Sequence, residues 1–123
     1  MSLGQKACRL AFAVGVAAIV ALSLLPQPSM PDVQLSDKAN HTLAYGCVML
    51  AGGLGFWLGR QRLLLAGGLF LLGGAMELLQ GLTPTRQMSL LDMVANTIGI
   101  AVGLLLAVLL TRYILQQPAK KAL

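Results

Sequence analysis

Four long apolar runs, separated by short polar segments, organise the chain. They cover residues 8–25, 39–58, 63–79 and 90–114. Each has about 17 to 25 residues, the length with which an α-helix crosses the hydrocarbon core of a bilayer. Unpaired backbone groups are too costly in lipid for open strands, so each run is predicted to be a helix. We therefore expect an all-α membrane protein, a four-transmembrane-helix bundle over residues 1–115, followed by a short polar cytoplasmic tail, 116–123.

The composition supports the bilayer as the solvent. Hydrophobic residues make up 57% of the chain and charged residues only 11%, whereas an ordinary soluble domain has about 25% charged residues. The formal net charge of +5 does not indicate nucleic-acid binding, because the basic residues form no stripe and aromatic residues are few. Cys8 and Cys47 lie within or beside apolar runs and are predicted to be small buried residues rather than a disulfide.

The basic residues predict the orientation of the helices. If the chain crosses four times, one side receives nearly all of them: Lys6, Arg9, Arg60, Arg62, Arg112, Lys120 and Lys121. That side is predicted to be cytoplasmic, so both termini lie inside. The loops 26–37 and 81–88 then lie outside, with only Lys38 and Arg86 near them. A cleaved signal peptide is the alternative for the first run, but no good small-x-small cleavage site precedes the proline-rich 26–31 segment.

Small residues recur every four positions in two of the runs. Ala51, Gly55 and Gly59 form one such stripe, and a second consists of Ala95, Gly99, Gly103 and Ala107. Stripes of this kind lie on one helical face and allow backbones to approach closely. We expect them to be packing seams within one chain, while a homo-oligomer contact through the same stripes stays an alternative.

Polar and ionisable side chains gather at the predicted outer ends of the last three runs. Asp37, His41 and Tyr45 are four residues apart and so share a helical face. The others are Lys38, Glu77, Gln80, Arg86, Ser89, Asp92 and Asn96. A charged group inside a membrane span costs several kcal/mol unless it is paired or faces a wet cavity. The sequence therefore predicts one shared polar pocket that opens toward the outer membrane surface.

Some of these residues also have simple structural interpretations. Asp37 is a favoured residue for a helix N-cap, and Ser89-x-x-Asp92 has the spacing of a capping box. Tyr45 is typical of an interfacial anchor, and His41 of a polar residue between helices. Glu77 lies within an apolar run where no cap needs it, so a functional role is favoured there.

The combined motif resembles the VanZ-like family. It runs Asp37-Lys38-x-x-His41-x-x-Ala44-Tyr45, Glu77-x-x-Gln80, then Arg86 and Ser89-x-x-Asp92-x-x-x-Asn96-x-x-Gly99. The resemblance covers about residues 36–103, and it implies a small integral protein of the bacterial cytoplasmic (inner) membrane. It also implies an association with reduced susceptibility to glycopeptide antibiotics, teicoplanin above all, without a settled mechanism.

Three functions remain open for the predicted pocket. It binds or modifies an envelope ligand (a membrane lipid, a lipid-linked cell-wall precursor or a glycopeptide antibiotic), with Lys38 and Arg86 holding an anionic group. Alternatively it is an enzyme on a lipid-linked substrate, with His41, Glu77 and Asp92 as candidate acid–base residues. The third possibility is a purely structural polar network. No cofactor is expected, and a metal on Asp92, His41 and Glu77 is disfavoured because no HExxH or paired-cysteine motif supports it.

Overall fold

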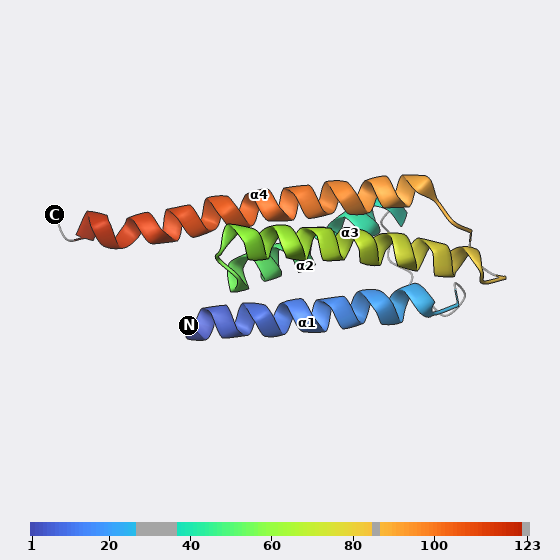
Figure 1. Ribbon diagram of the computed structural model, residues 1–123, viewed down its shortest axis with the longest axis horizontal. Helices are drawn as coiled ribbons and strands as arrows, with labels where there is room; N and C mark the ends of the chain where they lie inside the picture. Colours follow the sequence, from blue (N-terminus) through green and yellow to red (C-terminus); the bar gives the residue numbers. More distant parts are fainter. Residues whose placement is uncertain (27–36, 85–86, 122–123) are drawn as a thin grey trace.

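The computed structural model describes residues 1–26, 37–84 and 87–121, with side chains described as far as residue 116. The described residues form four α-helices and no strand: α1 (Leu3–Leu24), α2 (Asp37–Gly55), α3 (Gly59–Gly81) and α4 (Leu90–Lys121). The helices run up and down along one long axis, and both termini lie at the same end (Figure 1). The predicted all-α class is therefore confirmed.

The second helix is the centre of the bundle. α2 contacts all three other helices, and its most extensive contact is with α4. α1 and α4 flank the α2–α3 pair on opposite sides (Figure 1) and do not touch each other within the described residues. Because every helix reverses the direction of the one before it, α2 and α4 are parallel and begin at the same end of the bundle.

Several helix boundaries differ from the predicted runs. α2 begins at Asp37 and ends at Gly55, and α3 already begins at Gly59. The connection between them is therefore 56–58 rather than the basic 59–62 segment, because arginine and glutamine are good helix formers. α4 continues through the predicted polar tail to Lys121, since no glycine follows Gly103 to end the helix.

Three helices are long and apolar enough to cross a membrane. Among the described residues these are α1, α3 and the part of α4 between Leu90 and Gln116. Large apolar side chains cover their exposed faces, for example Leu10, Leu71 and Leu105. These features indicate a membrane protein. α2 is not in this group because its first two turns are polar.

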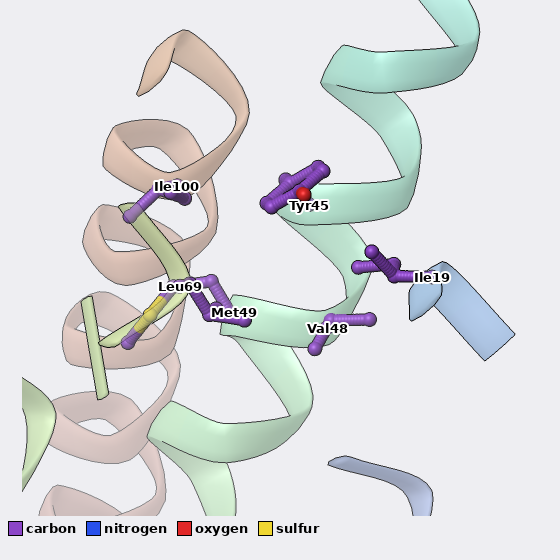
Figure 2. Packing of buried hydrophobic residues seen from close by; sticks show 6 residues of the cluster. All are labelled: Ile19, Tyr45, Val48, Met49, Leu69 and Ile100. Carbon is purple, nitrogen blue, oxygen red and sulfur yellow. The ribbon is translucent and has the colours of Figure 1, made fainter. Parts of the chain in front are cut away.

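A compact apolar cluster surrounds the middle of α2. It consists of Ile19, Tyr45, Val48, Met49, Leu69 and Ile100. Val48 lies beside Ile19 of α1, whereas Met49 points toward Leu69 and α4 (Figure 2). Met49 is fully buried. Because its members come from all four helices, this cluster holds the bundle together next to its polar end.

Backbone contact between α2 and α4 follows the predicted stripe in α4. Its members, Ala95, Gly99, Gly103 and Ala107, are all buried. A Cβ on Gly99 would collide with Thr42 O and lie 3.0 Å from Gly46 N, and one on Gly103 would collide with Gly46 O. The seam within one chain is thus confirmed, and Thr42 Oγ1 also donates across it to Ala95 O at 3.2 Å.

The stripe predicted for α2 was wrong. Its small residues at the α4 seam are Gly46 and Gly53, whereas Gly55 packs against Arg9 of α1. Gly59 belongs to α3 and has no neighbour within 4 Å of an added Cβ. The error came from continuing one helix through the turn that follows Gly55.

Side chains from three segments cap the C-terminal end of α2. Arg62 Nε donates to Gly53 O at 2.9 Å, Trp57 Nε1 to Leu54 O at 2.6 Å, and Arg9 Nε to Gly55 O at 2.9 Å. These carbonyls have no partner within the helix, and cations favour the negative end of a helix dipole. Arg62 is only 7% exposed, so this end of the bundle also holds a buried charged side chain.

Candidate functional site

The predicted site residues gather where α2 and α4 begin side by side. Asp37, Lys38 and His41 occupy the first turns of α2, and Asp92 and Asn96 the first turns of α4. The partial positive charges of two helix N-termini meet here, and they favour ionised carboxylates. The parallel arrangement of α2 and α4 therefore explains why acids of two distant segments lie together.

His41 is oriented by an amide of α4. Its Nδ1 lies 2.9 Å from Asn96 Oδ1. A carbonyl oxygen only accepts, so His41 Nδ1 is the donor and carries the proton. The lone pair of Nε2 in the neutral ring is left available on the opposite edge, 3.9 Å from Asp92 Oδ2.

Asp92 is the least satisfied polar group of the cluster. The residue is 7% exposed, and its Oδ1 has no hydrogen-bond partner among the described residues. Lys38 Nζ lies 3.9 Å from this oxygen, beyond hydrogen-bond distance. One ligand-type atom from each of Asp37, His41 and Asp92 lies within 4.8 Å of the others. Among the residues that the structure describes, these three are the group that could hold a metal ion.

Tyr45 and α3 close the cluster on its inner side. Tyr45 is buried one turn below His41. A Cβ on Gly73 would lie 3.4 Å from Tyr45 Oη and 3.1 Å from Asn96 Nδ2. Glycine at this position of α3 therefore leaves the room that both polar side chains occupy.

Glu77 caps the start of α4, contrary to the prediction that no cap needs it. It is not part of the group formed by Asp37, His41 and Asp92. Its side chain is 1% exposed, and Oε2 accepts from Ser89 N at 3.1 Å. Ser89 precedes α4, and its Oγ in turn accepts from Asp92 N at 3.3 Å. The Ser89–Asp92 spacing thus marks a real cap, and Glu77 extends that cap from a neighbouring helix. Among the described residues, Asp37 rather than Glu77 lies together with His41 and Asp92.

A groove of about 300 Å³ leads from the polar cluster along α1 and α2. Most of its wall is apolar, and includes Ala18, Ile19, Leu22, Ala44 and Val48. Its polar members are Ser23, Asp37, Asn40, His41, Tyr45 and Gln80. Gln80 also donates from Nε2 to Ser23 O at 3.2 Å, which links α3 to the end of α1.

The groove also shows what sequence reasoning missed. Asn40 was not a candidate, although it lies within the polar stretch that begins α2 and its position next to His41 was a usable signal. Lys38 and Ser89 lie at the cluster as predicted, but Ser89 acts there as a cap. Arg86 lies outside the described residues.

No family model, curated protein or solved structure matches the chain. The chemistry of the site therefore depends on its own geometry: an amphipathic groove whose polar end holds an oriented imidazole and two carboxylates.

Proposed function

We propose that the protein is a VanZ-like integral membrane protein that binds a lipid-associated envelope ligand through this groove. In this proposal it resides in the bacterial cytoplasmic membrane and takes part in the cell-envelope or glycopeptide response. The polar end of the bundle faces outward, and both termini are cytoplasmic. The observation that carries the proposal is the continuity of an apolar groove with a polar cluster at one end.

The groove matches a ligand with one hydrocarbon chain and a polar head. Its volume of about 300 Å³ is at the lower end of the roughly 300–1,000 Å³ of small-molecule sites. The apolar wall favours an acyl or isoprenoid chain, while Asn40 and His41 lie where a head group would end. Lys38 has a side chain 55% exposed, so its ammonium is free to turn toward an anionic group.

Four crossings are supported by the way α2 is enclosed. Gly52, Gly53 and Gly55 of α2 are buried against neighbouring helices, so protein rather than lipid surrounds much of this less apolar helix. Arg9 of α1 and Arg62 of α3 donate to carbonyls at the end of α2 that is opposite the polar cluster. Basic residues at that end favour its cytoplasmic placement.

Binding of a polyprenyl phosphate tests the proposal. We expect the wild-type protein in detergent micelles to bind it more tightly than the matching polyprenol, because the phosphate adds an anionic head. Ala44→Trp fills the groove and is expected to weaken binding at least about tenfold, since a small-molecule site buries most of its ligand. Ala101→Trp, at an exposed position of α4 that does not line the groove, is the matched control.

The same assay separates the alternatives. Equal binding by the Ala44→Trp and Ala101→Trp variants would contradict the groove as the binding site. Teicoplanin, which has an acyl tail, is measured in parallel as the glycopeptide probe. The available Nε2 lone pair of His41 also favours an acid–base enzyme, and mass spectrometry of the recovered lipid would then show a product that the His41→Gln variant does not form.

A further inference from the structure

We propose that Asp37, His41 and Asp92 form a binding site for a divalent transition-metal ion, with Zn²⁺ the best match. This inference is independent of the lipid ligand, because it rests on the three side chains alone. One imidazole and two carboxylates suit zinc and its first-row neighbours, whereas Mg²⁺ and Ca²⁺ prefer oxygen ligands only.

The imidazole is already oriented as a metal ligand. A metal-bound histidine usually donates its other ring N–H to an oxygen acceptor, which fixes the tautomer and the ring plane. His41 does so from Nδ1 to Asn96 Oδ1 at 2.9 Å. Its Nε2 therefore presents a lone pair toward Asp92 while Asn96 supports it from behind.

The second, independent observation is the buried carboxylate. The Asp92 side chain is 10% exposed, and its Oδ1 has no hydrogen-bond partner within the described part of the chain. A buried polar atom without a hydrogen bond is costly and needs an explanation. A cation held by both oxygens of the Asp92 carboxylate would supply the partner that Oδ1 lacks.

The distances agree with a shared ion. His41 Nε2 and Asp92 Oδ2 are 3.9 Å apart, which is too long for a hydrogen bond. Two such ligands at about 2.0–2.2 Å from one zinc ion lie at most about 4.3 Å apart. Asp37 is exposed and within 4.8 Å, so a small side-chain rotation brings it into the set. Three protein ligands would leave a fourth position for water or a ligand group.

The local charges favour a cation despite two opposing groups. Asp37 and Asp92 together carry two negative charges, and Lys38 contributes one positive charge near Asp92. The helix N-termini disfavour a cation by a smaller amount. The Lys38 side chain is more than half exposed, so it can turn into solvent when an ion binds. Its ammonium group competes with the metal ion for the Asp92 carboxylate.

Zinc titration of the full chain tests the site. The protein is purified without a histidine tag, treated with a chelator, and titrated with Zn²⁺ alone against a chromophoric competitor. We expect one ion per chain, with His41→Gln and Asp92→Asn each lowering the affinity at least tenfold. Lys38→Met is expected to raise it, an effect that a purely structural network does not predict. Thr97→Val, at an exposed position of α4, serves as the control and leaves the affinity unchanged.

Asn96 gives a second measurement. Loss of a group that supports a metal ligand typically costs about 10- to 100-fold in metal affinity, so Asn96→Ala is expected to weaken binding by that factor. Asn96→Asp keeps an acceptor for His41 Nδ1 and should restore most of it. The proposal would be overturned if the wild-type protein does not bind one zinc ion per chain in the titration. It would also be overturned if a folded His41→Gln variant binds zinc with wild-type affinity. If Asp92→Asn does not fold, His41→Gln and Lys38→Met still decide.

Discussion

The carboxylate of Glu77 is buried at the place where α4 begins. It accepts the backbone N–H of Ser89, 12 residues later in the chain, and so satisfies a donor that the helix itself leaves free. Its negative charge also lies near the positive end of the α4 dipole. These two effects explain how a carboxylate is kept almost fully out of solvent without a basic partner among the described residues.

Replacement of Glu77 should therefore affect stability rather than ligand binding. We expect Glu77→Ala to lower the free energy of unfolding by about 1–3 kcal/mol, since Ser89 N–H loses its acceptor. Glu77→Gln keeps an acceptor oxygen and should lose less. Unfolding by SDS in mixed micelles measures both variants, and zinc affinity is the internal control. A Glu77→Gln variant that is as stable as wild type but binds zinc tenfold more weakly would contradict this role.

The Glu77 contact also shows the limit of reasoning from spacing. The spacing of Asp37 and His41 predicts one face of a helix, and the structure brings both to Asp92. The partner of Glu77 depends on the turn between α3 and α4, which no periodicity reports. The same holds for Arg62, which the sequence offered only as a basic residue that predicts orientation: its Nη2 donates to Thr111 Oγ1 at 2.6 Å across the bundle.

At the scale of the elements, the contact between α2 and α4 determines the geometry of the site. The two helices touch backbone to backbone at Gly46, Gly99 and Gly103. This close approach brings His41 within 2.9 Å of Asn96. The stripe in α4 could be predicted because its period is that of a helix face. The small residues of α2 that face it could not be predicted without knowing that α2 ends at Gly55.

A pair of glycine substitutions tests the seam. Gly99→Ala places a Cβ against the backbone of Thr42 and Gly46, where neither backbone can yield without moving a helix. We expect it to lower the unfolding free energy by about 1–3 kcal/mol, the usual cost of overpacking. Gly67→Ala makes the same change at an exposed position of α3 with nothing within 4 Å. It should be neutral or stabilising by up to about 1 kcal/mol, as expected for alanine in a helix.

Thermal unfolding in detergent is the measurement for both variants. Zinc affinity adds a second readout, because a wider α2–α4 spacing would separate His41 from Asp92 while the chain stays helical. Equal losses in the Gly99 and Gly67 variants would contradict a tight seam and would point instead to a general effect of glycine replacement.

At the scale of the whole molecule, the two ends of the bundle have different chemistry. One end has the carboxylates and His41, where α2 and α4 begin. At the other end α2 finishes under the guanidinium groups of Arg9 and Arg62. α2 is the least apolar helix, and its contacts with the other three helices are the most extensive in the bundle. Its polarity is therefore compatible with a fourth crossing, because its neighbours shield it from lipid.

Cysteine labelling separates four crossings from three. In a background with Cys8 and Cys47 replaced, we expect Gln87→Cys to react with a membrane-impermeant maleimide in intact cells. Arg60→Cys should react only after permeabilisation, as should Ser2→Cys and Gln116→Cys at the two ends. All four positions are exposed in the structure. If α2 does not cross, Ser2→Cys and Gln116→Cys will label from opposite sides, and the outward polar pocket would lose its basis.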